Sequence, residues 1–295
     1  MSFLVKLMAT KPINSKGELM DTQIVVVFCL VDDMLKEMRH REDNQCGMSD
    51  AEVMTTAIIA ALYFGGNYTQ ARRLLGSQGY VPKMLDKSRF SRRLHRIKPF
   101  FLTLFSLLGE HWKALNENMI YSIDTFPIPV CDNYRIRRAK IYQNEAYRGY
   151  IASKKRYFYG LKLHLVTTED GKPVEFLLSP GSFHDSTSLY ALDFDLPVGS
   201  QLVGDKAYNN YAVEDMMAVA DIQLLPFRKK NSKRPVPPWV AYLQFHYRKM
   251  IETTGSLISN LLPKKIHATS TAGFELKVIL FVLACSINYL FKVAT

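Results

Sequence analysis

Cysteine is scarce in this chain, and its cysteines are not spaced as a metal-binding or redox pair. The 295 residues contain four, with no CxxC motif and no histidine at the spacing of a zinc ligand. This pattern argues against a zinc module and against a fold held by disulfides. Reduced thiols in the core are predicted instead, at Cys29, Cys46, Cys131 and Cys285.

The chain also has little that would direct it to a membrane. Lys6 and Lys11 interrupt the short apolar run near the N-terminus, which lacks the apolar core of a signal peptide. The most apolar stretch, Val278–Phe291, is about two thirds of the length needed to span a bilayer. A buried helix is therefore predicted there, with no membrane partner and an intracellular location.

Acidic residues are in the minority. Lys and Arg number 38 against 27 Asp and Glu, which gives a formal charge of +11 and a pI near 9.4. A polyanionic partner is favoured by this balance, and nucleic acid is the first candidate. The length is sufficient for about two domains.

Residues 1–117 are predicted to form a helical domain that binds DNA ends. Ser49 and Glu52 make the capping-box pattern just before the apolar run VMTTAIIAALYF, which indicates the start of a helix. Two further segments have apolar residues near helical spacing with arginines between them. The basic positions form either a helix face that lies on DNA or an ordinary solvated surface: Lys87, Arg89, Arg92, Arg93 and Arg96.

From residue 118 the pattern changes to short β-rich runs, MIYSID, YFYGLKLHLVTT, PVEFLLS, SQLVGD and IQLLPF. Asp170-Gly171 lies between the second and third runs and predicts a hairpin turn. Because helices separate only the later strands, the order predicts a mixed α/β sheet flanked by helices, whose later strands run parallel to the first. Residues 118–295 are predicted to form this second domain.

Two carboxylates stand at the ends of predicted strands. Asp124 ends the first strand and Asp205 ends the fourth, each after apolar residues. A charge held against a sheet is unfavourable unless it is paired or binds a cation. Two such charges at neighbouring strand ends therefore predict a divalent metal site.

A third carboxylate lies on the predicted helix Val240–Leu262. Glu252 points about 160° away from the centre of its apolar stripe, so it does not face that core. Arg248 precedes it by one turn, and the pair is either an ordinary surface ion pair or part of a site.

These residues carry a resemblance to a known family. The runs YSIDTFPIPV, PGSFHDSTSL, VGDKAYNN and RKMIETTGSLI, in this order, resemble bacterial insertion-sequence transposases, and more narrowly insertion-sequence family 982, over essentially the whole chain. The resemblance implies an RNase H-like fold with a DDE triad, which falls on Asp124, Asp205 and Glu252 as catalytic and metal-binding residues. It implies two Mg²⁺ or Mn²⁺ ions, since oxygen-only ligands favour these metals.

The same resemblance implies the partners. Double-stranded DNA is expected, both transposon ends and target, with a homodimer in the DNA complex and a bacterial, nucleoid-associated cytoplasmic location. Related transposases carry Tyr-x2-Arg-x3-Glu-x6-Lys around the glutamate, and here Phe245 and Ser259 replace the tyrosine and the lysine. Lys249, Lys264 or Lys265 could replace that lysine. Only 46 residues separate the second aspartate from the glutamate, so no large inserted domain is expected.

Secondary candidates lie in PGSFHDSTSL. His184 and Asp185 could approach the DNA or the metals, whereas the favoured alternative is that Asp185 or Ser182 caps the next helix. Asp132 lies beside Arg135, Arg137 and Arg138 and is predicted to be an ion-pair partner rather than a fourth ligand.

Basic and aromatic residues alternate between residues 132 and 162, where nine cations stand against two acids. Such a mixture suits binding along the DNA phosphate backbone together with stacking on unpaired bases. The alternative is that the stretch is an ordinary solvated loop. The basic loop 228–234 could clamp flanking DNA, and Trp239 is expected in the core, with base stacking as the alternative. The further predicted DNA contacts are Lys154, Lys155, Arg156, Lys206, Arg228, Lys229, Lys230 and Arg248.

The function predicted from these observations is metal-dependent cleavage of DNA at transposon ends, followed by strand transfer to target DNA. Two alternatives stay open. One is an RNase H-like nuclease or resolvase without strand transfer. The other is a decayed transposase that acts as a DNA-binding regulator, although such a protein would not need all three carboxylates.

Overall fold

The computed structural model describes residues 16–192, 194–228, 232–236, 238–242, 244–245, 253, 256, 262–263 and 266–292. The chain divides into two compact units. Unit 1 comprises Met1–Phe105, Leu261–Ile266 and Ala272–Thr295, and unit 2 comprises Ser106–Asn260 and His267–Thr271.

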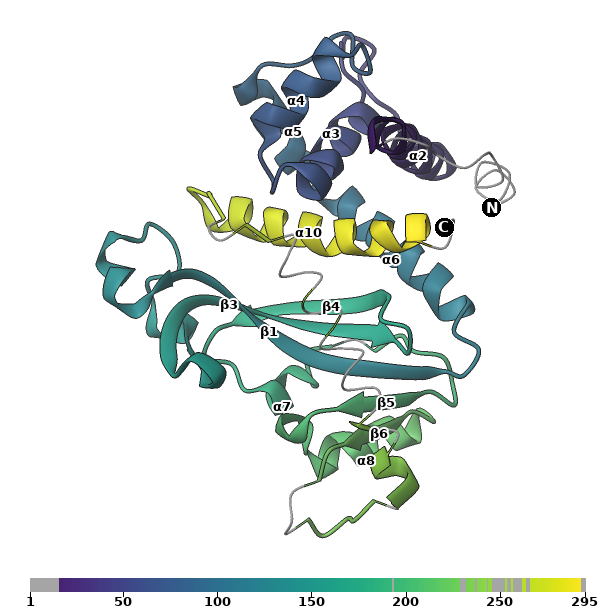
Figure 1. The fold of residues 1–295 in the computed structure, drawn as a ribbon, viewed down its shortest axis with the longest axis vertical. Helices are drawn as coiled ribbons and strands as arrows, with labels where there is room; N and C mark the ends of the chain where they lie inside the picture. Colours follow the sequence, from purple (N-terminus) through teal and green to yellow (C-terminus); the bar gives the residue numbers. More distant parts are fainter. Residues whose placement is uncertain are drawn as a thin grey trace. The chain divides into compact units, whose positions relative to one another are not determined.

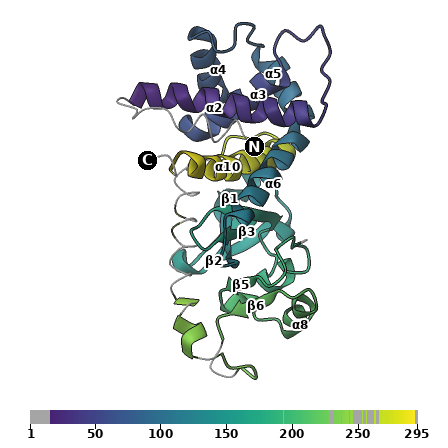
Figure 2. The ribbon, with the colours of Figure 1, turned by 90° about the vertical axis from the view of Figure 1, so that its right-hand side faces the viewer.

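Unit 1 is helical (Figures 1 and 2). Its start signal is confirmed, because Ser49 accepts a hydrogen bond from the amide of Glu52 and the Glu52 carboxylate accepts one from the amide of Ser49. The helix that follows, α3 (Asp50–Tyr63), is mostly buried, and α2 (Lys16–Glu37) lies across it (Figure 2). The helices of the unit are α2 (Lys16–Glu37), α3 (Asp50–Tyr63), α4 (Tyr68–Ser77), α5 (Lys87–Arg96), the first half of α6 (Lys98–Ala114) and α10 (Thr271–Lys292).

The C-terminal helix α10 belongs to unit 1. Glu275 forms an ion pair with Lys98 at 3.2 Å. The Phe281 ring packs against Gly66, and a Cβ added at Gly66 would lie 3.1 Å from this ring. The sequence analysis had instead assigned α10 to the second domain, because it placed the domain boundary near residue 117. An apolar helix fits any apolar face of suitable shape, so chain order did not reveal which unit it joins.

Helix α10 is longer than the apolar stretch suggested. Thr271–Phe291 is long and apolar enough to cross a membrane by length and composition, but 72% of its most apolar window is buried inside the protein. The predicted buried helix is therefore confirmed, while its predicted length was too short. Cys285 is buried on this helix, whereas Cys29, Cys46 and Cys131 are only half-buried, and none of the four forms a disulfide.

Unit 2 is built on a six-stranded mixed sheet (Figure 1). Strand β3 lies between β1 on one side and, on the other, β2 near its start and β4 along the rest, all antiparallel. β5 is parallel to β1, and β6 is parallel to β5, as the strand order predicted. The strands are β1 (Ile120–Asp132), β2 (Arg148–Ile151), β3 (Arg156–Thr168), β4 (Pro173–Pro180), β5 (Gln201–Gly204) and β6 (Gln223–Pro226).

Three local features hold this sheet. The predicted hairpin is present between β3 and β4, with Gly171 at φ 88°, a left-handed conformation that favours glycine. The second half of α6 packs so closely on β4 that a Cβ at Gly109 would lie 2.6 Å from the carbonyl oxygen of Val174. Nearby, the buried Lys113 ammonium pairs with Glu175 at 3.0 Å and fixes the same helix to the sheet.

The remaining elements are short. Helix α8 (Tyr211–Val219) packs beside β6, and α7 (Asp185–Ser188) lies near the 3-10 turn η4 (Lys206–Tyr208). Strand β2 was not predicted, because its four residues lie inside a basic and aromatic stretch and include Gly149, which has low strand propensity. Further 3-10 turns are η1 (Asn133–Arg138), η2 (Glu145–Tyr147) and η3 (Ala152–Lys154).

Candidate active site

Asp124 and Asp205 both come just after the end of the parallel β1–β5 ladder. Asp205 directly follows β5, as predicted, but Asp124 lies inside β1, which continues to Asp132, so the prediction that it ends the first strand was wrong. The last pair of the β1–β5 ladder is Ile123 with Gly204, and each aspartate is the next residue. Neighbouring strands are about 4.8 Å apart, and residues in register on parallel strands point to the same face. Asp205 keeps an extended backbone, at φ −70° and ψ 172°, so the two half-buried aspartates leave the end of the ladder at neighbouring positions.

The backbone orients each carboxylate locally. The Oδ1 atom of Asp124 accepts a hydrogen bond from the amide of Thr125 at 2.7 Å, and the Oδ1 atom of Asp205 accepts one from the amide of Lys206 at 2.7 Å. Such bonds limit side-chain rotation and set the direction of the carboxylates. The donor set is oxygen-only, which fits Mg²⁺ or Mn²⁺.

The third predicted ligand, Glu252, lies outside the described residues, and so do Arg248, Lys229 and Lys230. Their predicted roles stay predictions.

A buried polar chain lies behind the two aspartates. The Thr125 hydroxyl is 2.9 Å from Nδ1 of His164 and 2.5 Å from the hydroxyl of Tyr208, and Nε2 of His164 is 2.7 Å from the Ser179 hydroxyl. Burial lowers the pKa of His164 to about 4, with smaller effects from Asp185 and Lys162, so the imidazole is neutral near pH 7. One ring nitrogen then donates and the other accepts.

Burial also raises the pKa of Tyr208, and the charges of Asp185, Asp124 and Asp205 raise it further. Its phenol therefore stays protonated beside these carboxylates. Sequence reasoning missed Thr125, His164 and Tyr208. A single histidine within the apolar run YFYGLKLHLV was the available signal.

His184 and Asp185 have different surroundings. His184 is exposed, and it is the N-cap residue of α7 without a side-chain capping bond. Asp185 instead pairs with Lys162 at 3.0 Å, and the Ser182 hydroxyl donates to the carbonyl of Ala146. The favoured capping interpretation was therefore wrong, because a lysine on β3 and a backbone carbonyl bind these groups.

One group of possible metal ligands among the described residues lies elsewhere, in unit 1. Donor atoms of His40, Glu42 and Asp50 all lie within 4.8 Å of one another. However, the Arg93 guanidinium pairs with Asp50 at 2.7 Å and with Glu42 at 2.9 Å. The cluster is thus an internal ion-pair network whose positive charge Arg93 already supplies.

This network corrects one predicted DNA contact. Arg93 has a side chain only 9% exposed and faces the interior of unit 1, so it does not belong to the basic surface of α5. Arg89, Arg92 and Arg96 are exposed on that helix, although Arg89 also pairs with Asp86 at 3.3 Å. Charge alone could not separate one buried arginine from its neighbours.

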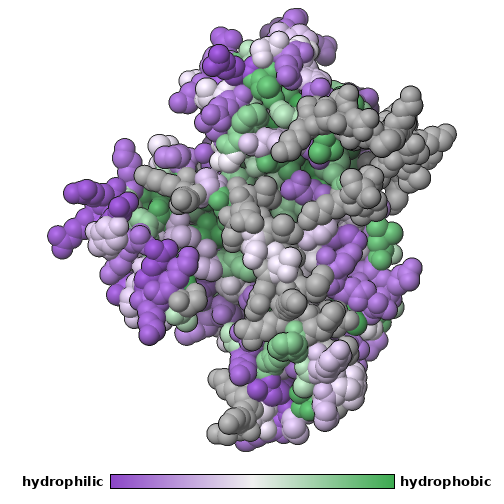
Figure 3. All heavy atoms as spheres, in the orientation of Figure 1, coloured by the Kyte–Doolittle hydropathy of each residue, from purple (hydrophilic) through white to green (hydrophobic). Residues whose placement is uncertain are grey.

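A second basic surface covers the end of the β1–β3 ladder, where hydrophilic side chains gather in the view of Figure 3. Tyr150 and Tyr157 are cross-strand partners of the β2–β3 hairpin, both about half exposed, with ring centroids 4.9 Å apart. Arg148 lies over the Tyr157 ring at 4.4 Å. The exposed cations of this hairpin and of η1 are Arg135, Arg137, Arg138, Lys154, Lys155 and Arg156.

Asp132 is an ion-pair partner, as predicted, but its partner is Arg156, at 3.1 Å, rather than one of the three arginines that follow it. The antiparallel register of β1 and β3 brings this pair together: Asp132 lies opposite Phe158 on the neighbouring strand.

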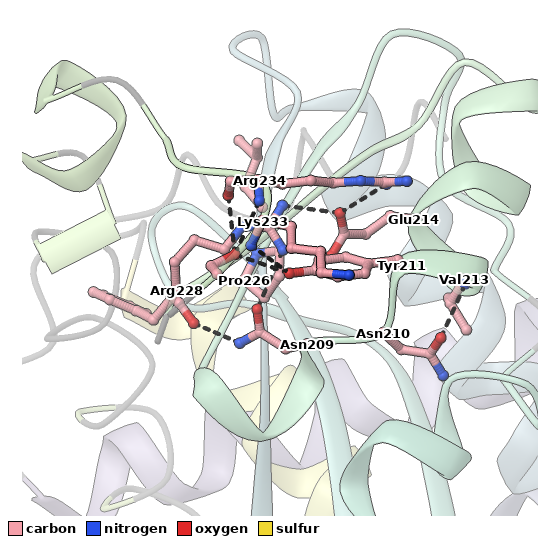
Figure 4. Close-up of polar contacts among 12 residues, drawn as sticks. Asn209, Asn210, Tyr211, Val213, Glu214, Pro226, Arg228, Lys233 and Arg234 are labelled. Atoms are coloured by element: carbon pink, nitrogen blue, oxygen red, sulfur yellow. Dashed lines mark hydrogen bonds and ion pairs between the residues drawn. The ribbon is translucent and has the colours of Figure 1, made fainter. Parts of the chain in front are cut away.

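Arg228 and Arg234 both pair with acidic side chains of α8 (Figure 4). Arg228 donates to both oxygens of Glu214, at 2.6 and 2.8 Å, and its side chain is 12% exposed. Arg234 pairs with Asp215 at 2.8 Å and with Glu214 at 3.3 Å, and both guanidinium groups lie against the Tyr211 ring. Arg228 is therefore a structural residue, and its predicted role as a DNA contact was wrong.

Trp239 is also not where it was expected. Its side chain is 60% exposed, so the predicted core position was wrong. Phe245, which replaces the tyrosine of the related motif, is 73% exposed. Exposed aromatic rings of this size leave the base-stacking alternative open for Trp239.

A mixed sheet in which β1, β5 and β6 are parallel, with two aspartates just past the end of the β1–β5 ladder, is compatible with the RNase H-like fold of metal-dependent enzymes that cut nucleic acids. Residues 115–269, just over half of the chain, match the family model described as Transposase DDE domain. The chain therefore belongs to the transposase DDE domain family. No curated protein and no solved structure matches it significantly.

The family indicates a transposase, and DNA is the partner on which transposases act. Domains of this type generally use divalent metal, which agrees with the chemistry of the two adjacent aspartates.

Proposed function

We propose that the protein is an insertion-sequence transposase, close to insertion-sequence family 982, that cuts DNA at transposon ends and joins them to target DNA. The observation that supports this proposal is the placement of Asp124 on β1 and Asp205 just after β5, each directly following the last residue pair of the parallel β1–β5 ladder. Glu252 is proposed as the third carboxylate.

Two Mg²⁺ ions bound by these three carboxylates would activate the attacking water or 3′-hydroxyl and stabilise the leaving oxygen. The residues of the chain supply orientation. The amides of Thr125 and Lys206 direct the two aspartates, and the neighbouring Tyr208 phenol stays neutral, so it adds no negative charge at the site.

DNA binding is proposed to use two separate surfaces. One is the exposed face of α5, with Arg89, Arg92 and Arg96. The other is the β2–β3 hairpin with η1, whose cations suit the phosphate backbone and whose tyrosines suit unpaired bases. A DNA-bridged homodimer follows from the need to bring two ends together. The helical unit 1 is proposed to bind the ends and unit 2, which contains the sheet, to carry out the chemistry.

Strand transfer tests this proposal against a simple nuclease. Purified protein, Mg²⁺, DNA from the ends of the element that encodes it and a supercoiled plasmid are expected to give joined products with the 3′-hydroxyl linked to plasmid DNA. Cleaved ends without joined products would favour the nuclease or resolvase alternative. DNA binding without cleavage would favour a decayed transposase that acts as a regulator.

The hairpin surface makes a separate prediction about salt. Each phosphate contact that is lost flattens the slope of log affinity against log salt by about one unit. Replacing both Lys154 and Lys155 by Gln is therefore expected to flatten it by about two units, measured by fluorescence anisotropy with end DNA. Lys36→Gln, at an exposed position on α2 that pairs with Asp32, is the control and should leave the slope unchanged. Equal slopes for all three proteins would assign the hairpin to bare surface.

A further inference from the structure

The two aspartates share a connection beyond the end of the strand ladder. Pairing between β1 and β5 stops at Ile123 and Gly204, so the ladder itself does not fix the spacing of the next residues. Past this point the hydroxyls of Thr125 and Tyr208 are joined by a 2.5 Å hydrogen bond. Both residues are directly tied to the aspartates.

On one side, the Thr125 amide donates to Oδ1 of Asp124 at 2.7 Å. On the other side, the Tyr208 amide donates to the carbonyl oxygen of Asp205 at 3.0 Å, which closes the turn η4. The Thr125–Tyr208 bond therefore joins the segment that orients one carboxylate to the segment that positions the other.

This series of hydrogen bonds continues into the sheet through His164. His164 is fully buried on β3 and bonds Thr125 on one side and Ser179 of β4 on the other. Tyr208 is 1% exposed and Ser179 is 3% exposed. Water does not easily compete with such buried bonds, and polar groups buried to this degree are strongly destabilising when left unpaired.

We propose that the hydrogen-bonded chain Ser179–His164–Thr125–Tyr208 positions Asp124 and Asp205 for metal binding, with Thr125 as its central positioning residue. This inference rests on the proposed function, since it assumes that the two aspartates bind metal. It assigns no ligand or proton-transfer role to the four residues. Hydrogen-bonded partners behind metal ligands typically change metal affinity by about 10- to 100-fold when they are removed.

The test measures Mn²⁺ affinity directly, by electron paramagnetic resonance of free Mn²⁺ in the absence of DNA. Thr125→Val removes the hydroxyl at constant shape, and Tyr208→Phe breaks the same bond from its other side. Each is expected to weaken Mn²⁺ binding by about 10-fold, and the double variant by no more than either single change. Thr125→Ser retains the hydroxyl and should restore most of the affinity.

Thr167→Val is the matched control. Thr167 lies on β3, is 1% exposed, and its hydroxyl has no hydrogen-bond partner, so the same substitution removes a buried hydroxyl of the same sheet outside the chain. Its Mn²⁺ affinity should equal that of the wild type. The melting temperature of every variant separates a loss of folding from a loss of metal binding.

The outcomes distinguish the two proposals. Wild-type affinity in both Thr125→Val and Tyr208→Phe, or equal weakening in Thr167→Val, would overturn the positioning role while leaving the proposed metal site intact. Wild-type protein that binds no Mn²⁺, or binds it no better than Asp124→Asn, would overturn the metal site and the positioning role together.

Discussion

Asp124→Asn or Asp205→Asn is expected to lower Mg²⁺-dependent cleavage of transposon ends by about three orders of magnitude or more. The amide keeps the shape of the side chain but removes the negative charge that would hold a cation where the β1–β5 ladder ends. Affinity for end DNA should stay within about twofold, because phosphate contacts supply most of it. Gel-based cleavage and anisotropy on the same preparations measure both quantities.

Loss of one ligand disables the whole constellation, so the variant with both substitutions should be no worse than either alone. Glu252→Gln is expected to behave in the same way. Asp132→Asn is the control, since this aspartate lies on the same strand but pairs with Arg156. Cleavage that survives substitution at 124, 205 and 252 would contradict the assignment, and so would an equal loss of cleavage in the control.

Removal of the Glu214 carboxylate is expected to have the largest effect on stability. Glu214→Gln leaves the Arg228 guanidinium, whose side chain is 12% exposed, without its bidentate partner. Breaking a buried ion pair on one side costs about 3 kcal/mol or more. For a unit of this size the melting temperature should fall by about 6–12 °C, measured by calorimetry or circular dichroism.

Asp215→Asn serves as the comparison for this prediction. Asp215 also pairs with Arg234, but its side chain is 66% exposed, so solvent screens the interaction. No measurable shift in melting temperature is expected there. Similar shifts in the two variants would mean that burial of Glu214 does not decide the stability of the segment after β6.

The parts of the fold predicted from sequence were those that depend on local chemistry. The capping box at Ser49 and Glu52 and the hairpin at Asp170-Gly171 require only neighbouring residues to agree. The parallel pairing of β5 with β1 followed from the intervening helical segment, because parallel strands need a long connection. Asp124 and Asp205 stood out because a charge after an apolar strand is rare without a ligand.

The features that sequence reasoning missed depend on contacts between distant residues. Arg93 and Arg228 had the same surroundings in sequence as other basic residues, and only their burial against Asp50 and Glu214 separates them. Trp239 was expected in the core because core packing is the default for a tryptophan, yet its side chain is exposed. Thr125 and His164 are 39 residues apart, and only the register of β1 with β3 brings them together.

The place of α10 has a consequence for how the protein is made. Helices α2 to α5 of unit 1 are translated before the sheet of unit 2, but α10, which carries Glu275 and Phe281 into contact with Lys98 and Gly66, is translated after it. The apolar surface that α10 covers is therefore without this partner until all the strands of unit 2 have been synthesised. A stop codon anywhere before residue 271 would therefore remove α10 from unit 1 as well as truncating the chain.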